Sequence, residues 1–318
     1  MAQKNNKLQT AKNAKSDEFY TTENVCVEEL KHYTHHFKDK VVYCNCDNPE
    51  WSEFWRYFHL RFSELGLKKL ISTHYEENKP TYKMEYYGGD DNNIDAGIKT
   101  PLIGNGDFRS DECAAVLDEA DIVSSNPPFS LFKFYISQLL SKNKKFIVLG
   151  NMNASTYNNI FPCIKDNQIW YGASIHSGDR EFRVSDDYPL RRPPHRIDED
   201  GNKYVKINGV RWFTNLTYDT VIESIALTKT YDPKLYPKYD NYDAINVNKT
   251  MDIPSDYNGL IGVPISFLDK YCPKQFEIVG YSAELAGPVI VDGKVKKRPQ
   301  RFFLDGKRLY DRIVIKKK

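Results

Sequence analysis

The segment from Ser125 to Ser130 reads SNPPFS and contains the groups needed to hold a planar aromatic amine. Asn126 offers a side-chain carbonyl, and Pro127 offers a main-chain carbonyl on a backbone stiffened by Pro128. These two acceptors can take both N–H bonds of the amine, which leaves the nitrogen lone pair directed out of the ring plane towards an electrophilic methyl group. Phe129 can stack on the ring. The alternative interpretation is a proline-rich turn that binds nothing.

The elements around this segment predict where it stands. DIVSSN, immediately before it, is typical of a buried strand, so the motif follows a strand's carboxyl end. Further strands are expected at 41–45, 68–75 and 144–153, and helices at 22–37, 49–66, 110–120 and 131–143. This alternation predicts an α/β domain with a parallel sheet and helices on both faces. Ligands of such sheets bind beyond the carboxyl ends of the strands.

Capping signals set the expected helix ends. Thr22 and Ser110 are candidate N-caps, and Gly66 is a candidate left-handed residue after the second helix. That helix has an apolar stripe, formed by Trp51, Phe54, Trp55, Phe58, Phe62 and Leu65. In the second half of the chain, Asn208-Gly209 between two apolar runs predicts a β-hairpin.

Two regions have other patterns. The stretch 76–105 is rich in Gly, Asp, Asn and Tyr, and is expected to be irregular or a short hairpin. After about residue 230, short strand-like pieces such as FEIVGY, GPVIVDGKV and RIVIKKK predict a smaller mixed or β-rich module.

The composition favours a soluble globular protein. The 318 residues are 40% hydrophobic and 28% charged. No apolar stretch approaches the roughly 20 residues that span a bilayer, and the N-terminus does not resemble a secretory signal. The expected location is the cytoplasm, without membrane contact. The six cysteines match no zinc pattern and are expected to be reduced thiols, and His32, His35 and His36 are expected at an exposed helix end, so no metal site is predicted.

Basic residues gather at both ends of the chain, although the net charge is only +2. Residues 1–15 contain four lysines and no acid, and the last thirty residues contain eleven bases. These ends suit either phosphate contacts or a solvated tail. The expected organisation is a basic flexible arm at 1–15, a catalytic domain at 16–229 and a recognition region at 230–318.

Three segments resemble the EcoRI-type family of adenine-specific DNA methyltransferases: DEFYTTENVCVEEL, KVVYCNCDNPEWSEFWRYF and SNPPFSLF. They cover about the first half of the chain. The resemblance implies a Rossmann-like class I methyltransferase sheet with a smaller C-terminal target-recognition module. It also implies transfer of a methyl group from S-adenosylmethionine to the N6 atom of a flipped adenine in duplex DNA, by a restriction-modification enzyme or an orphan modification enzyme.

The resemblance also assigns roles to residues. Asn126, Pro127, Pro128 and Phe129 would hold the adenine. Asp47 would lie near the cofactor's ammonium group, and Asp107 near its adenine amine. The remaining cofactor residues would be Phe19, Tyr20, Thr21, Cys44, Asn45, Asn48, Pro49 and Phe108. Arginines expected to contact DNA are Arg191, Arg192, Arg196, Arg298 and Arg301.

Some of these positions have structural alternatives. Asp47 can form an Asx turn or cap the following helix, Asp107 can be a simple turn acid, and Phe19 and Tyr20 can be core residues. Arg211 and Trp212 can flank the flipped base, but packing is the favoured interpretation.

The chain also departs from most methyltransferases. It has no glycine between Val41 and Gly66, and the acid that closes the second strand is unclear, with His74, Tyr75 and Glu76 as candidates.

Other functions share the same motif. An Asn-Pro-Pro-Phe element can also serve RNA adenine or protein glutamine as the methyl acceptor, and a DNA-binding protein without catalysis is a third alternative. The basic C-terminus and the size of the second module favour DNA, and no feature indicates self-association, so a monomer is expected.

Overall fold

A computed structural model describes residues 19–77, 80–176, 178–184, 195–218, 224–291, 293–297 and 299–318. The expected arm at 1–15 and the arginines Arg191, Arg192 and Arg298 lie outside these residues. The chain divides into two compact units: Met1–Ala154 with Ile169–Asp219, and Ser155–Gln168 with Thr220–Lys318. The longer segment of the second unit thus begins ten residues before the expected recognition region, and the unit also includes Ser155–Gln168, from within the expected catalytic domain.

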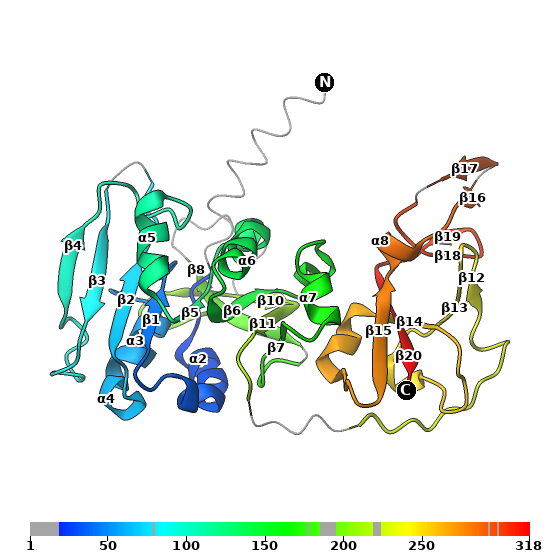
Figure 1. Cartoon of the computed structure of the whole chain (residues 1–318), viewed down its shortest axis with the longest axis horizontal. Coiled ribbons are helices and arrows are strands. Elements are labelled where there is room, and N and C mark those ends of the chain that lie inside the picture. Colours follow the sequence, from blue (N-terminus) through cyan, green and yellow to red (C-terminus); the bar gives the residue numbers. More distant parts are fainter. Residues whose placement is uncertain are drawn as a thin grey trace. The chain divides into compact units, whose positions relative to one another are not determined.

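The first unit is built on an eight-stranded sheet. Its strands are β1 (Val41–Cys44), β2 (Lys69–Thr73), β3 (Tyr82–Tyr86), β4 (Ile98–Pro101), β5 (Ile122–Ser125), β6 (Lys145–Asn151), β7 (Trp170–Tyr171) and β11 (Val210–Thr214). They lie in the order β4-β3-β2-β1-β5-β6-β11-β7 (Figure 1). The chain passes from β1 to β2 on one side and then returns to β5 on the other, so the strand order reverses between β1 and β5.

Strand direction is mixed. β2, β1, β5 and β6 are parallel. The strands outside them are antiparallel to their inner neighbours. The prediction of a parallel sheet is therefore confirmed at the centre and wrong at the edges. The reason lies in the connections: β2 continues through the short segment 74–81 into β3, and so short a link returns the chain beside β2 in the opposite direction.

Helices cover both faces of this sheet. They are α2 (Glu23–Leu30), the 3-10 helix η1 (Lys31–His36), α3 (Glu53–Leu60), α4 (Phe62–Leu65), α5 (Asp111–Glu119) and α6 (Phe132–Ser141). Val42 and Cys44 of β1 share a buried core with Leu30 and Phe58, from the first helices. Tyr43, between them on the strand, faces the other way, towards Cys113 of α5.

The predicted helix over 49–66 is shorter than expected and is interrupted. Ser52 is its N-cap, accepting from the amides of Phe54 and Trp55 at 3.2 and 3.3 Å. The helix breaks at Arg61 and ends at Gly66, whose φ of 62° is the expected left-handed conformation. Trp51 precedes the helix and is 45% exposed, so its assignment to the buried stripe was wrong.

The other caps vary in type. Ser110 caps α5 as expected, because its hydroxyl accepts from the Cys113 amide at 3.2 Å. Thr22 stands at the N-cap position of α2, but its side chain makes no capping hydrogen bond.

Asn208-Gly209 does not form the predicted hairpin. It joins β10 (Lys203–Asn208) to β11, and these strands belong to different sheets. β10 pairs with β8 (Asp179–Val184) and β9 (Arg196–Ile197), whereas β11 pairs with β6 and β7. A tight type I′ turn needs positive φ at both central residues, and only Gly209 has it, at 73°.

The second unit has a five-stranded sheet in the order β12-β13-β14-β20-β15. These strands are β12 (Lys238–Tyr239), β13 (Tyr242–Asn246), β14 (Ile261–Pro264), β20 (Arg312–Lys317) and β15 (Phe276–Tyr281). Two small hairpins are added, β16 (Val289–Val291) with β17 (Lys294–Lys296), and β18 (Phe303–Leu304) with β19 (Lys307–Arg308). The three strand-like pieces expected here are thus confirmed as strands.

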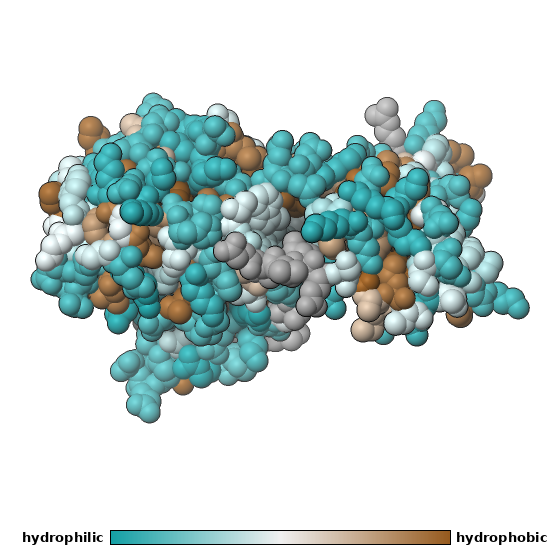
Figure 2. All heavy atoms as spheres, turned by 60° about the horizontal axis from the view of Figure 1, so that its bottom comes forward, coloured by the Kyte–Doolittle hydropathy of each residue, from teal (hydrophilic) through white to brown (hydrophobic). Residues whose placement is uncertain are grey.

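The remaining helices are short: η2 (Phe129–Leu131), η3 (Met152–Thr156), α7 (Phe161–Lys165), η4 (Thr250–Asp252), η5 (Ile265–Lys270) and α8 (Ser282–Leu285). Among the described residues, no helix has the length and apolar character needed to cross a membrane. The face drawn in Figure 2 is mostly hydrophilic, with separate hydrophobic areas.

Candidate functional site

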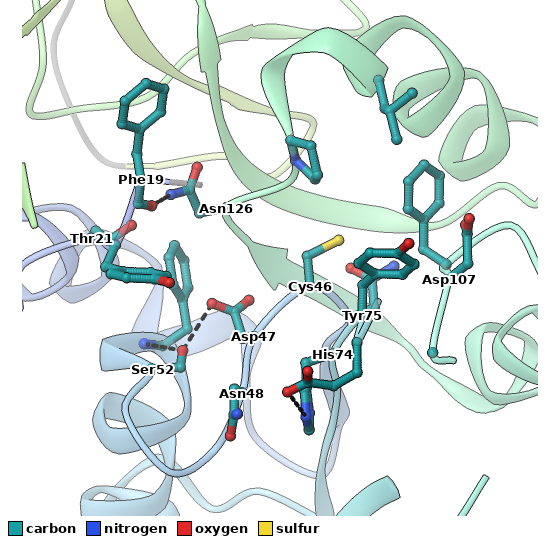
Figure 3. Close-up of a pocket in the computed structure, with 18 of the residues that line it drawn as sticks. Phe19, Thr21, Cys46, Asp47, Asn48, Ser52, His74, Tyr75, Asp107 and Asn126 are labelled. Atoms are coloured by element: carbon teal, nitrogen blue, oxygen red, sulfur yellow. Dashed lines mark hydrogen bonds and ion pairs between the residues drawn. The ribbon is translucent and has the colours of Figure 1, made fainter. Parts of the chain in front are cut away.

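A cavity of about 580 Å³ opens in the first unit where β1, β2 and β5 end. Its walls come from the loops after these three strands, the start of α3, the segment before α2 and the turn before α5 (Figure 3). The lining residues are Phe19, Tyr20, Thr21, Asn45, Cys46, Asp47, Asn48, Trp51, Ser52, Glu53, Phe54, His74, Tyr75, Glu76, Glu77, Gly106, Asp107, Phe108, Arg109, Asn126, Pro128, Ser130 and Leu131. The cavity therefore lies at the reversal of strand order, as the sheet topology predicts.

Asp47 is the central carboxylate of the loop after β1. Its Oδ1 accepts from the Ser52 hydroxyl at 2.8 Å, and its Oδ2 accepts from the Ser125 hydroxyl at 2.6 Å. The backbone amide of Asn126 adds a third hydrogen bond. Asp47 thus joins the loop after β1 to the N-terminus of α3 and to the start of the SNPPFS segment. It does not itself cap the helix, because Ser52 holds that position.

Burial raises the pKa of Asp47 to about 6, although its three hydrogen bonds act in the opposite direction. Desolvation is the larger cause, since the carboxyl group is buried in the cavity wall. The group therefore titrates close to neutral pH and would gain from a cation placed beside it.

The loop after β1 is fixed by side chains. The Tyr135 hydroxyl of α6 donates to Asn45 Oδ1 at 2.5 Å, and the Glu50 amide donates to Asn48 Oδ1 at 3.0 Å. The Ser125 hydroxyl accepts from the Cys46 amide at 3.2 Å. These contacts hold a loop that contains no glycine.

Asn126 lines the same cavity at the end of β5. Its Nδ2 donates to the main-chain carbonyl of Phe19 at 2.5 Å (Figure 3). A carbonyl oxygen only accepts, so this contact decides which end of the amide faces Phe19. The Oδ1 atom is consequently left to accept hydrogen bonds from a ligand.

The rest of the SNPPFS segment is divided between cavity and core. Pro128 lines the cavity, and its carbonyl accepts from the Leu131 amide at 3.0 Å. Pro127 is buried outside the lining, and its carbonyl has no hydrogen-bond partner among the described residues. Phe129 is half-buried, and its ring packs against Phe19 at a centroid distance of 5.7 Å.

The segment before α2 closes one side of the cavity. Tyr20 forms an antiparallel bridge with Arg183, and its ring lies 4.2 Å from that of Trp51. Thr21 is buried, and its Oγ1 has no hydrogen-bond partner among the described residues. An unsatisfied buried hydroxyl in a cavity wall marks a position where a ligand can supply the missing bond.

The opposite wall comes from the ends of β2 and of the segment before α5. Gly106 has a φ of 75°, and a Cβ there would lie 2.0 Å from the His74 carbonyl oxygen, so glycine is required for this close approach. Asp107 pairs with Arg109 at 2.6 Å, and this guanidinium lowers the pKa of Asp107. Asp107 also accepts a hydrogen bond from the Arg109 amide at 2.9 Å, which is the geometry expected of a turn acid. It lines the cavity as well.

The other predicted site residues lie away from the cavity lining. Cys44 is in the core on β1, and Pro49 is buried beside the loop. Arg196 is exposed, pairs with Glu181 at 2.8 Å and stacks 3.8 Å above the ring of Tyr204.

Two further arginines are engaged internally. Arg301 pairs with Asp311 at 2.6 Å. Arg211 is buried on β11 beside the fully buried Trp212, as the packing interpretation predicts.

Sequence reasoning did not assign several groups that shape the site. Ser52 and Ser125 hold Asp47, Tyr135 holds Asn45, and Trp51 and Arg109 line the cavity. The position of Ser52 two residues before Phe54 is a capping signal that could have been found. The contact between Tyr135 and Asn45 spans ninety residues and has no local signal.

The whole chain has clear relatives. Residues 7–318 match the family described as "Adenine-specific methyltransferase EcoRI". "Type II methyltransferase M.EcoRI" of Escherichia coli is 44% identical, over 99% of this chain and 97% of the relative. "Type II methyltransferase M.MgeORF184P" of Mycoplasma genitalium is 40% identical over 96% of this chain, and "Type II methyltransferase M.MpnI" of Mycoplasma pneumoniae is 37% identical over 97%, each covering 97% of the relative. No solved structure matches the chain.

Proposed function

Because the chain belongs to the EcoRI family of adenine-specific methyltransferases, we propose that its cavity binds S-adenosylmethionine beside a flipped adenine of duplex DNA. The protein is a site-specific DNA adenine methyltransferase. The proposal concerns which groups perform each part of that reaction. A single observation carries it: Asn126 is oriented by the Phe19 carbonyl so that its Oδ1 is available in the same cavity as Asp47.

The residues of the cavity fit the cofactor. Its volume of about 580 Å³ is within the usual range for such ligands. Asp47 offers a carboxylate to the ammonium group, and the unsatisfied Thr21 hydroxyl offers a donor and an acceptor. Phe108 and Tyr75 offer aromatic faces, and Glu76 is a candidate for the ribose hydroxyls. When bound, S-adenosylmethionine supplies an electrophilic methyl group on a sulfonium centre.

The target amine is held by oxygen acceptors. Asn126 Oδ1 takes one N–H of the adenine amine. We assign the other N–H to the carbonyl of Pro127, which belongs to a residue next to the cavity lining and has no backbone partner among the described residues. Two such bonds direct the nitrogen lone pair out of the ring plane. Catalysis then depends on position and on dipoles that are already oriented before the substrate arrives.

Rotating the adenine out of the duplex costs a few kcal/mol, on the order given for unstacking one base. Phosphate contacts from basic side chains offset this cost. Phe129 packs against Phe19, so we assign to it the support of the Asn126 loop in addition to contact with the base.

The fold supports the same proposal. The parallel β2-β1-β5-β6 centre with antiparallel β11 beside it is the arrangement expected of a class I methyltransferase sheet. We assign target recognition to the second unit, which is β-rich and contains most of the C-terminal bases. One chain provides all of the groups assigned to cofactor and adenine, so a monomer suffices.

Transfer of labelled methyl from S-adenosylmethionine to unmethylated duplex DNA, followed by digestion to nucleosides, tests the proposal. We expect the label in N6-methyldeoxyadenosine, and we expect Asn126→Ala to lose transfer but keep cofactor binding. Label on cytosine, or undiminished transfer by the variant, would contradict the assignment of Asn126.

A further inference from the structure

The hairpin β16–β17 in the second unit has one face against the protein and one face in solvent. Val289 opposes Lys296, and Ile290 opposes Val295. Val289 is buried, and Lys296 lies 5.7 Å from the ring of the buried Phe303, so this pair faces the unit. Because side chains alternate along a strand, Ile290 and Val295 face outwards.

This outward face is apolar, which is unusual for a small surface hairpin. Ile290 is 67% exposed and Val295 is 62% exposed, and they are directly opposite each other. Solvent-facing strand positions are ordinarily polar, and an adjacent pair of exposed branched residues is typical of a surface that meets a partner. Figure 1 shows that the hairpin extends beyond the five-stranded sheet.

The surroundings of the pair are positively charged. Lys294 precedes Val295 in β17, Lys297 follows the strand, and the neighbouring hairpin β18–β19 contributes Lys307 and Arg308, all exposed. None of the ion pairs between described residues includes any of these four cations, whereas Arg301 nearby in sequence is paired with Asp311. Cations without an acidic partner among the described residues, placed around an apolar centre, complement a polyanion that also presents apolar groups.

We propose that the β16–β17 hairpin enters the major groove of the DNA substrate and that Ile290 and Val295 contact thymine methyl groups there. This inference rests on the proposed function. The major groove admits a two-stranded β-ribbon, and the thymine C5-methyl is the apolar group it displays. Lys297, Lys307 and Arg308 contact phosphates beside the ribbon.

The test compares two proteins on two DNAs. The methylated site is first mapped on plasmid DNA, and short duplexes containing it are made with thymine or with deoxyuridine, which lacks the methyl group. We expect deoxyuridine to lower the wild-type kcat/KM by ~5- to 100-fold, the range given for one wrong base pair. The double variant I290S/V295S should be slow on both duplexes and nearly insensitive to the replacement.

A control variant comes from η4 of the same unit, at the end of β20 that lies away from the hairpin. Met251 in η4 is 61% exposed, and η4 lies near the end of β20, where Lys317 bonds the Ser255 carbonyl. The hairpin follows α8, which is tied to the start of β20 through Ser282 and Asp311 at 3.2 Å. Met251→Ser should keep wild-type rates and the wild-type response to deoxyuridine. Cofactor affinity and thermal melting of each variant check that it has folded.

The outcomes separate this inference from the proposed function. A wild type indifferent to deoxyuridine, or an I290S/V295S variant with wild-type rates, overturns the hairpin assignment while methyl transfer stands. If the wild type transferred no methyl to either duplex, the proposed function would fail, and duplex affinity by fluorescence anisotropy would still decide the hairpin's part. Loss of self-association in the variant with unchanged DNA affinity would show that the face meets a second copy, and would also overturn the proposal.

Discussion

The cavity of the first unit and the hairpin of the second differ in the burial and the bonding of their side chains. In the cavity, Asp47 is buried and Asn126 is half-buried, and hydrogen bonds tie both to the protein before any ligand arrives. On the hairpin, Ile290 and Val295 are exposed, and the cations around them have no acidic partner among the described residues.

Under the proposed function, the contrast separates the methyl transfer in the cavity from DNA recognition at the hairpin. A buried group that hydrogen bonds already hold in place contributes strongly to binding when a ligand completes its bonding. Its removal therefore lowers ligand binding or turnover by a large factor. An exposed cation contributes weakly, and its contribution is screened by salt. Substitutions in the cavity should therefore act on cofactor binding and turnover, and substitutions on the hairpin on DNA affinity and sequence choice.

The largest expected effect is that of Asn126→Ala. Removing an oriented acceptor from the reacting amine should lower kcat by ~10²- to 10³-fold or more. Labelled methyl transfer under saturating DNA and cofactor measures it, with a cofactor titration on the same sample. Asn92→Ala, at an exposed position of the same unit, is the control and should behave as wild type. A decrease confined to DNA affinity would break the contrast between the two regions.

Asp47→Asn should weaken S-adenosylmethionine binding by ~10- to 100-fold at pH 8, the cost of losing a charge-assisted contact. The wild-type affinity should rise as pH increases through about 6 and then level off, because the carboxyl group is protonated below its pKa of about 6. The variant should show no such rise. Calorimetric titration from pH 5 to 8 measures both.

The same pKa affects stability. The folded protein keeps the Asp47 proton to a higher pH than the unfolded chain, so this group's stabilisation is present below pH 4 and lost as pH rises to about 6. The loss is up to about 3 kcal/mol in the free energy of unfolding. Asp107→Asn is the control, since the pKa of Asp107 is lowered and gives no step near pH 6. A wild-type curve without the step would show that Asp47 is not desolvated.

Thr21→Val should separate folding from binding. Its hydroxyl is buried without a partner among the described residues, so the free protein should be as stable as wild type or slightly more stable. Cofactor affinity should fall ~5- to 10-fold, the value of one hydrogen bond. Thr21→Ser keeps the hydroxyl and should restore most of the affinity. Equal affinities for the valine and serine variants would mean that the cofactor does not use Thr21.

The smallest expected effect is that of Lys297→Ala on the hairpin. Removing one phosphate contact should reduce the slope of log affinity against log salt by about 1, without changing which sequence is preferred. Anisotropy titrations of a duplex at several salt concentrations measure the slope. Lys249→Ala, at the exposed position just before η4, is the matched control. A change in kcat at saturating DNA would show that the hairpin affects turnover as well as DNA affinity, contrary to the prediction.

Local signals in the sequence predicted much of the fold. Ser110 and Gly66 lie where capping rules place them, and β5 runs directly into the SNPPFS segment. The prediction of a hairpin at Asn208-Gly209 was wrong because turn residues do not determine which strands pair. β10 pairs with β8 and β11 pairs with β6, so the two strands belong to separate sheets. The assignment of Trp51 to the apolar stripe of the helix was wrong because an apolar ring beside a cavity has the same local sequence pattern as one in the core.

The family resemblance, together with the chemistry of the SNPPFS segment, predicted several residues that line the cavity. It did not predict the hydrogen bonds that hold them. Asp47, Asn126 and Thr21 all line one cavity, although 105 residues separate Thr21 from Asn126. The contact of Asn126 with Phe19, and that of Asp47 with Ser125, depend on the sheet bringing distant loops together. Such contacts follow from the tertiary structure and leave no spacing pattern in the chain.

The loop after β1 has a further consequence because it lacks glycine. Side chains of Asn45, Asp47 and Asn48 hold it in place, so it has little freedom left to lose when a ligand arrives. A glycine loop can adapt one residue at a time during evolution. Here Tyr135 and Ser125 would have to change together with their partners, so this part of the cavity is expected to diverge in correlated steps.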